Sequence, residues 1–231
     1  MHIKFWKAGS AAEIFYDLSQ SRSGKLHWFT RSTCFFPIDY SKLTLEMSTP
    51  DYINYFYALP ERKKEIILKN QDALYKGINH ELNNAICDGL DEKESGNYTL
   101  QTNCELKNIN DNLQLTFLHT EEEKSFDTSA FILATGYQPV MPPFLKPLYP
   151  YLTINRNGRY KANRNYSIDN KNSIFIQNAE QATHGFNAAD LSLGPYRNAV
   201  IINSILGREE YAIEKRVTFQ TFGITAFGDT V

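Results

Sequence analysis

The chain has 231 residues, of which 42% are hydrophobic and 13% aromatic, and its formal net charge is -2. This hydrophobic content suits one substantial α/β core or two small domains and excludes wholesale disorder. The near-neutral charge disfavours binding to nucleic acid or to an anionic membrane. We find no apolar run near the roughly 18 residues of a membrane span and no signal-peptide pattern, so we expect a cytoplasmic protein.

The amino-terminal region predicts a β-α-β unit. Residues 2–6 alternate like a strand, residues 8–21 carry apolar side chains at helical spacing, and residues 25–31 form a second β-prone run. The two strands should be parallel, with a right-handed crossover between them. Residues 35–50 follow as an ordered loop, because they show no sustained period.

The pattern becomes helical between about residues 50 and 90. Pro50 and Pro60 suit first-turn positions, and Thr49 is a candidate N-cap. We therefore predict a helical insert between two β-rich parts of the chain.

The next residues predict a meander of antiparallel strands, formed by YTLQTN, CELKNI and LQLTFLH between residues 98 and 119. The acidic run at 121–124 reads as a solvated loop. Residues 131–133 and 174–176 are candidates for buried strands. A helix should start near Pro195 and stop at Gly207, followed by a weakly β-prone or frayed tail.

Three cysteines, Cys34, Cys87 and Cys104, lie far apart without CxxC spacing. This argues against a zinc site and against a redox-active dithiol, so we expect reduced thiols and no metal.

Two features of the first β-α-β unit suggest a dinucleotide site. The turn at Gly9 and Ser10 precedes a helix, whose unpaired backbone N–H groups could bind a phosphate, although a plain strand-to-helix turn would look the same. Arg31 ends the second strand, where a guanidinium could pair with a ribose 2′-phosphate or with a surface carboxylate.

Two later motifs carry further candidates. ATGY, at 134–137, ends an apolar strand and would allow a turn beside a dinucleotide, or it could simply terminate the strand. HGFNAADLSLG, at 184–194, precedes a helix whose N-terminus could meet a flavin. Within it, His184 is a tempting base, but a structural role is the simpler interpretation.

Three stretches, taken in order, resemble the microbial lysine N6-hydroxylases and ornithine N5-oxygenases that make hydroxamate siderophore precursors. They are GSAAEIFYDL with the strand ending at Arg31, then DYSKLTLEMSTPDY with ILATGY, and finally HGFNAADLSLGPYRNAVIINSILG. The resemblance extends from about Lys7 to Gly207.

The resemblance implies contacts with two cofactors and a substrate, and no catalytic side chain, because the chemistry belongs to the flavin. The NADPH contacts would be Lys7, Ala8, Gly9, Ser10, Arg31 and Tyr75. The FAD contacts would be Ala134, Thr135, Gly136, Tyr137 and Ala189. The substrate contacts would be Leu45, Glu46, Met47, Ser48 and Ser192, with Ser192 matching a serine that binds the substrate's carboxylate.

The chain departs from the family pattern at the turn and in the substrate loop. Trp6, Lys7 and Ala8 stand where small glycines are expected, which should obstruct a pyrophosphate. The ornithine-acting branch has asparagine where this chain has Leu45 and Tyr75. These differences favour the lysine-acting branch.

The resemblance implies an incomplete α/β fold of two Rossmann-like dinucleotide-binding domains with a helical insert. Residues 1–130 would form the NADPH-binding domain, with the insert at about 50–90. Residues 131–210 would form the carboxyl-terminal part of the FAD-binding domain and the substrate site, and residues 211–231 a tail.

The implied activity is N-hydroxylation of the terminal amine of L-lysine, driven by hydride transfer from NADPH to FAD and by activation of molecular oxygen on the flavin. The family's GxGxxG flavin turn has no match here, so we expect a truncated chain with an exposed sheet edge that could promote homo-oligomers. L-Ornithine or a diamine remains an alternative substrate. The alternative function is a non-catalytic remnant or a weak nucleotide-binding module.

Overall fold

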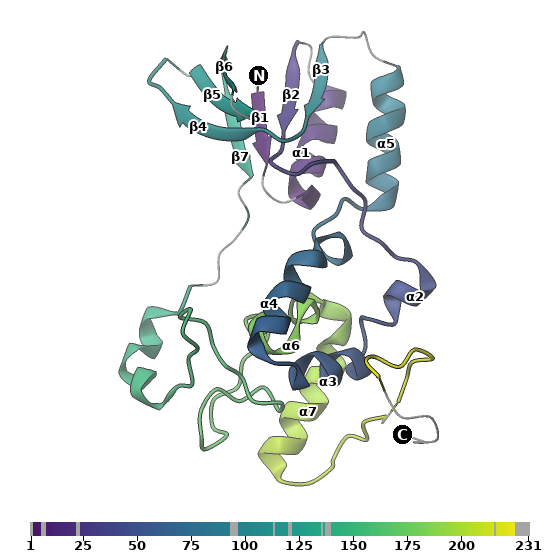
Figure 1. The fold of residues 1–231 in the computed structure, drawn as a ribbon, viewed down its shortest axis with the longest axis vertical. Coiled ribbons are helices and arrows are strands. Elements are labelled where there is room, and N and C mark those ends of the chain that lie inside the picture. Colours follow the sequence, from purple (N-terminus) through teal and green to yellow (C-terminus); the bar gives the residue numbers. More distant parts are fainter. Residues whose placement is uncertain are drawn as a thin grey trace. The chain divides into compact units, whose positions relative to one another are not determined.

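The computed structural model describes residues 2–5, 8–21, 24–92, 97–112, 114–119, 122–134, 136, 140–214 and 216–224. The chain divides into two compact units (Figure 1). Unit 1 comprises Met1–Asp39 and Ala73–Gln138, and unit 2 comprises Tyr40–Asp72 and Pro139–Val231. The helical insert is therefore shared: its first part packs with the carboxyl-terminal residues rather than with the first predicted domain.

Unit 1 is built on a parallel sheet. Its strands are β1 (His2–Phe5), β2 (Leu26–Phe29), β3 (Tyr98–Gln101) and β7 (Phe131–Ala134), in the order β3-β2-β1-β7. Each neighbouring pair is parallel, and helix α1 (Ala8–Ser21) connects β1 to β2. The predicted β-α-β unit is confirmed. The strand at 131–133 is also confirmed, although β7 is only partly buried.

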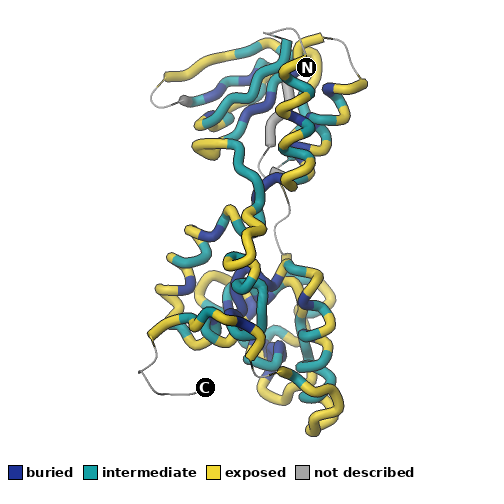
Figure 2. The backbone as a smooth tube through the Cα atoms, turned by 90° about the vertical axis from the view of Figure 1, so that its right-hand side faces the viewer, coloured by how far each residue is buried: buried dark blue, intermediate teal, exposed yellow. Residues whose placement is uncertain are grey.

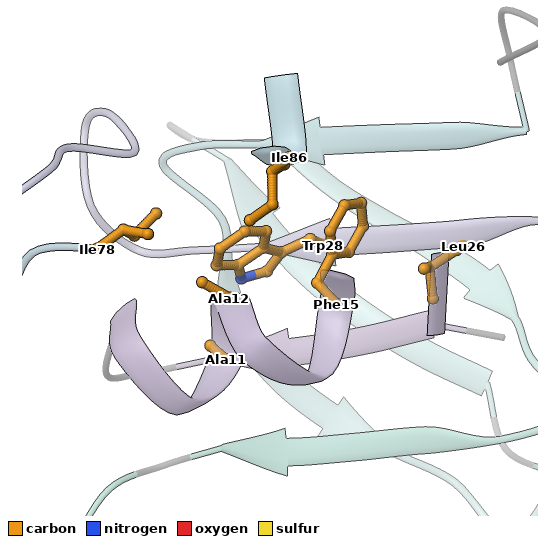
Figure 3. Close-up of a cluster of buried hydrophobic side chains, with 7 residues drawn as sticks. All are labelled: Ala11, Ala12, Phe15, Leu26, Trp28, Ile78 and Ile86. Atoms are coloured by element: carbon orange, nitrogen blue, oxygen red, sulfur yellow. The ribbon is translucent and has the colours of Figure 1, made fainter. Parts of the chain in front are cut away.

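Successive residues of β2 face opposite sides of the sheet, as the pleat requires. Trp28 packs with Phe15 of α1, at 5.2 Å between ring centroids, and belongs to the same cluster as Ile86 of α5 (His80–Asp91). Figure 3 shows the indole at the centre of this cluster. Phe29 stacks instead on Phe117, at 4.2 Å. The alternating apolar residues of β2 thus join the helices on one face to a second sheet on the other.

This second sheet is antiparallel and consists of β4 (Glu105–Ile109), β5 (Gln114–His119) and β6 (Glu122–Asp127). Two predictions for this region were wrong. The run YTLQ is not part of the meander, because β3 pairs with β2 in the parallel sheet. Most of the acidic run, Glu122–Lys124, is not a loop but the start of β6, whose exposed edge keeps the carboxylates in water.

Unit 2 is mainly helical. It contains α2 (Lys42–Leu45), α3 (Pro50–Ala58), α4 (Glu61–Asn70), α6 (Gln181–His184) and α7 (Gly194–Leu206). The 3-10 helices of this unit are η2 (Pro143–Tyr151), η3 (Phe186–Ala189) and η4 (Leu191–Leu193), and η1 (Asp72–Leu74) spans a boundary between the two units in the sequence.

Local sequence signals set the helix ends in unit 2. Thr49 caps α3 by accepting a hydrogen bond from the Tyr52 amide, and Pro50 occupies the first turn, as predicted. Pro60 differs, because it is the N-cap of α4 rather than part of its first turn. Gly207 ends α7 at a φ of 64°, a conformation that favours glycine.

The predicted strand at 174–176 does not form. Phe175 makes only an isolated antiparallel bridge with Ser167, while Ile174 and Ile176 pack against a small apolar cluster that contains Leu152 and Ile168. Their apolar character therefore reflects burial in a loop region. Residues 216–224 of the tail form no regular element either.

Figure 2 colours the buried residues dark blue. In unit 2 they gather in α3, in α6 and η3 and between residues 160 and 169, and in unit 1 they gather in α1, β2 and β5. Tyr52 and Phe56 of α3 are almost fully buried, and the Tyr52 ring lies 5.8 Å from that of Phe186. Within the described part of the chain, no helix is long and apolar enough to cross a membrane.

Candidate functional site

The candidate coenzyme residues of unit 1 follow the parallel strands. Because β1, β2 and β7 run in the same direction, their carboxyl ends meet at one edge of the sheet. Gly9 and Ser10 follow β1, Arg31 follows β2, and Gly136 follows β7. The topology therefore brings three separate sequence motifs to one edge.

Helix α1 begins three residues after the end of β1. Ala8 is the first helical residue, and Ser10 is exposed in the first turn. A Cβ added at Gly9 would meet no heavy atom within 4 Å, so this helix start is open on the side where the glycine lies. Such a site, with unpaired N–H groups and no bulky side chain at Gly9, fits a phosphate. Trp6 and Lys7 lie outside the described residues.

Arg31 is exposed two residues beyond the end of β2. The neighbouring backbone is fixed, since the Thr30 amide donates to Gln101 O at 2.8 Å and Cys104 N donates to Thr30 O at 2.8 Å. A long cationic side chain on a fixed backbone at the adjacent strand end suits a ribose phosphate.

The ATGY motif is described only in part. Ala134 is the last residue of β7, and Gly136 has a φ of 72°, a backbone conformation that favours glycine. Thr135 and Tyr137 lie outside the described residues. Tyr75 is half-buried in unit 1, and the Lys76 ammonium lies 5.1 Å from the centre of its ring.

The candidate substrate residues lie in unit 2, and all except Ser192 belong to a segment that we call the substrate loop, residues 43–51. Leu45 is 45% exposed at the end of α2. Glu46, Met47 and Ser48 are half-buried before the Thr49 cap. The loop thus offers both apolar and polar groups near the start of α3.

Glu46 does not present a free carboxylate. Its Oε2 accepts a hydrogen bond from Gln220 N at 2.8 Å, and its Oε1 accepts one from Phe219 N at 3.3 Å. These N–H groups, Gln220 first, hold the pKa of the Glu46 carboxyl below its usual value. The carboxylate is therefore bound by the tail of the same chain.

The motif before α7 supplies Ala189 and Ser192, both exposed. The Ser192 hydroxyl donates to Asp190 Oδ1 at 2.7 Å, and the Ser192 amide donates to the same oxygen at 2.9 Å. The predicted substrate serine thus lies beside a carboxylate.

A buried amide joins these two parts of unit 2. Asn187 Nδ2 donates to Met47 O at 2.9 Å, although the two residues are 140 positions apart. Asn187 is 1% exposed, and its Oδ1 has no hydrogen-bond partner among the described residues. The substrate loop and the turn before Ala189 are therefore neighbours.

The buried side chain of Arg197 holds this turn through hydrogen bonds to its backbone. Its Nη1 donates to Asn187 O and to Ala188 O, both at 3.0 Å, and its guanidinium lies 3.9 Å from the buried carboxylate of Glu180. Burial raises the pKa of Glu180 to about 7. Sequence analysis missed this pair, although Arg197 is the single charged residue in the otherwise neutral helix α7.

His184 is packed in the interior of unit 2, which agrees with a structural role and not with that of a base. It is 1% exposed, its ring stacks on Tyr166 at 4.4 Å, and its Nδ1 lies 2.9 Å from Thr183 Oγ1. Burial lowers the pKa of His184 to about 3, which keeps the imidazole neutral. Within the described residues, no group of three or more metal-ligating side chains was found.

The chain resembles known proteins over most of its length. The family model for L-lysine 6-monooxygenase/L-ornithine 5-monooxygenase matches residues 8–176. A putrescine N-hydroxylase of Shewanella oneidensis is 44% identical over 224 residues, which cover 92% of this chain and 45% of the relative. The L-lysine N6-monooxygenase of Escherichia coli is 26% identical over 217 residues, which cover 87% of this chain and 51% of the relative.

A solved structure has a similar fold. The cadaverine monooxygenase DfoA of Erwinia amylovora, determined with FAD bound, superposes with a TM-score of 0.91 at 37% identity, covering 97% of this chain and 55% of that one. The chain spans about half the length of the relatives that it matches. The predicted α/β flavoprotein monooxygenase fold is confirmed by this likeness. The chain belongs to the L-lysine 6-monooxygenase/L-ornithine 5-monooxygenase family.

Proposed function

We propose that the chain is part of an NADPH- and FAD-dependent enzyme that hydroxylates one amino group of a short aliphatic diamine for siderophore biosynthesis. The balanced reaction consumes the amine, molecular oxygen, NADPH and a proton, and yields the hydroxylamine, NADP+ and water. The observation that carries the proposal is the fold shared with a cadaverine monooxygenase over 97% of this chain.

In this proposal, unit 1 binds NADPH at the carboxyl edge of its parallel sheet. The backbone around Lys7, Ala8 and Gly9 and the Ser10 hydroxyl would hold the pyrophosphate, and Arg31 would pair with the 2′-phosphate. The open space at Gly9 supports this assignment, because a dinucleotide needs close approach to the backbone there. Tyr75 would contact the coenzyme from the same unit.

FAD, when bound, would supply the oxygen chemistry. The chain's own contributions would be Ala134, Thr135, Gly136, Tyr137 and the exposed turn at Ala189. The unpaired Oδ1 of Asn187, buried next to that turn, supports a polar ligand or water here. The supporting groups Arg197 and Asn187 keep the turn in one position.

The substrate loop and Ser192 would bind the amine. Leu45, Met47 and Ser48 would line the site, and Glu46 would act indirectly, through its hydrogen bonds to the carboxyl-terminal residues. The lysine preference inferred from the sequence has less support than the diamine alternative, since the relatives at 44% and 37% identity act on putrescine and cadaverine. The Asp190 carboxylate beside Ser192 agrees with this, because it would attract an ammonium and repel a substrate carboxylate.

The test is to load the enzyme of which this chain is part with FAD and to measure NADPH oxidation and hydroxylamine formation with putrescine, cadaverine and L-lysine. We expect a yellow protein whose kcat/KM for the diamines exceeds that for lysine by about tenfold or more. Asp190→Asn should reduce this preference. A protein that stays colourless with added FAD and oxidises no NADPH on addition of amine would contradict the proposal and support the non-catalytic alternative.

A further inference from the structure

The carboxyl-terminal segment, residues 216–222, lies across the substrate loop. Besides the two bonds to Glu46, Val217 N donates to Asp51 Oδ2 at 2.9 Å, and Gln220 Nε2 donates to Leu43 O at 2.6 Å. Four hydrogen bonds thus join segments more than 160 residues apart in the sequence. Two of the four end on the same carboxylate, so Glu46 is the centre of the contact.

An aromatic contact anchors the end of this segment. The Phe222 ring meets Tyr52 of α3 edge-on, with 5.0 Å between centroids, and lies 6.0 Å from Tyr55. Phe219 makes no comparable packing, because its side chain is 94% exposed. The segment is therefore held by its backbone amides at 217, 219 and 220 and by the side chains of Gln220 and Phe222.

The segment is also shaped to offer those amides. Thr218 is 7% exposed and its hydroxyl donates to Gln220 O at 2.9 Å, while Arg216 Nε donates to Thr218 O at 3.2 Å. These local bonds fix a bend in which two successive N–H groups point at one carboxylate. Bonds to a charged acceptor are stronger than those between neutral groups.

The substrate loop is thereby held from two directions. Asn187 binds the Met47 carbonyl, and the carboxyl-terminal segment binds the Glu46 carboxylate. Leu45 and Ser48 lie next to these two fixed points, so their positions depend on both. Loss of either contact would leave the loop with one fixed point.

We propose that the carboxyl-terminal segment is a clamp that positions the substrate loop for amine binding. Glu46 is then a positioning residue, whose carboxylate binds the clamp and not the amine. The clamp itself follows from contacts within unit 2, and its effect on the amine rests on the proposed function. The groups that bind the Glu46 carboxylate are therefore two amides of the same chain, 173 and 174 residues away in the sequence.

The first test measures the clamp without cofactor or substrate. Hydrogen exchange of the amides in residues 43–52 is compared between the wild type, Glu46→Ala, Phe222→Ala and a chain that ends at residue 214. Loss of one or two net hydrogen bonds or of an aromatic contact should speed exchange there by about tenfold. The control Phe219→Ala keeps the backbone amide and removes only an exposed ring, so it should exchange like the wild type. Equal exchange in all variants would overturn the clamp.

The second test links the clamp to the amine. In FAD-loaded protein, Glu46→Ala and the shortened chain should raise the KM for the diamine by about three- to tenfold while kcat changes less than about twofold, since loop positioning affects binding before chemistry. A synthetic peptide of residues 212–224, added to the shortened chain, should lower the KM again. An unchanged KM would overturn the positioning role. A wild type without amine turnover would reject the proposed function and leave the exchange result to decide the clamp.

Discussion

Arg197 illustrates how one buried cation can order a turn of the backbone. It is 2% exposed, donates to two consecutive carbonyl oxygens, and faces Glu180, which is fully buried. Removing Arg197 would take away a cation that lowers the pKa of Glu180, so the buried carboxyl would be protonated in the folded protein. The two carbonyls would also lose their donor.

Arg197→Met should therefore lower the free energy of unfolding at pH 7 by about 2–4 kcal/mol, chiefly because two carbonyl oxygens lose their donor. The matched control is Arg208→Met, because Arg208 forms an exposed ion pair with Glu210 at 3.0 Å. That change should cost less than about 1 kcal/mol. Urea unfolding of both variants measures the difference, and equal losses would contradict the role of Arg197.

Glu180 and His184 predict opposing pH effects on stability. Burial raises the pKa of Glu180 from 4.5 to about 7, so its contribution is fully present below pH 4.5 and is lost as the pH rises through 7. Burial lowers the pKa of His184 from 6.5 to about 3, so its contribution is present above pH 6.5 and is lost as the pH falls toward 3. Between pH 4.5 and 6.5 the two effects offset each other.

Replacing Glu180 should reveal the pH dependence of stability that His184 causes alone. In Glu180→Gln, the free energy of unfolding should fall between pH 6.5 and 5 more steeply than in the wild type, by about 1.4 kcal/mol per pH unit. Urea unfolding at a series of pH values gives both curves. Parallel curves would show that Glu180 does not titrate in this range.

At the scale of single elements, Gly77 controls how two segments of unit 1 meet. Residues Pro37 and Ile78 form a parallel bridge, in which Ile38 N donates to Ile78 O at 2.8 Å. A Cβ at Gly77 would lie 2.4 Å from Ile38 N and 2.5 Å from Pro37 C. The bridge would have to open, and the buried Ile78 would move with it.

Gly77→Ala should lower the free energy of unfolding by about 1–3 kcal/mol, the usual cost of overpacking. Gly9→Ala is the matched control, because its added methyl meets no atom within 4 Å and lies in a helix, where alanine is favoured by up to about 1 kcal/mol. Thermal unfolding compares the two. An unchanged free energy of unfolding in Gly77→Ala would mean that the two segments can separate without destabilising the protein.

Elements whose signals are local could be predicted from the sequence. Helix α1, strand β2, the Thr49 cap and the Gly207 stop each depend on neighbouring residues. Strand β3 was placed in the wrong sheet, because its partner β2 lies about 70 residues away. Strand β6 was missed, because an exposed edge strand can carry charges that otherwise indicate a loop.

At the scale of the whole molecule, the sequence identified motifs but not the contacts among them. The order of the parallel strands brings Ser10, Arg31 and Gly136 to one edge, as the β-α-β pattern implies. The bond from Asn187 to Met47 and the bonds from the tail to Glu46 join residues 140 to 174 positions apart. Such contacts are set by tertiary packing, which no local pattern in these residues encodes.

We propose that unit 1 binds NADPH and selects it over NADH by its 2′-phosphate. Titration of the purified chain with NADPH and NADH, followed by coenzyme fluorescence, tests this most directly in the wild type and in Arg31→Ala. The wild type should bind NADPH at least about tenfold more tightly than NADH, and the variant should lose this preference, since one charge-assisted pair contributes about 1.5–3 kcal/mol. Equal affinity of the wild type for both coenzymes, or an unchanged preference in Arg31→Ala, would contradict the account.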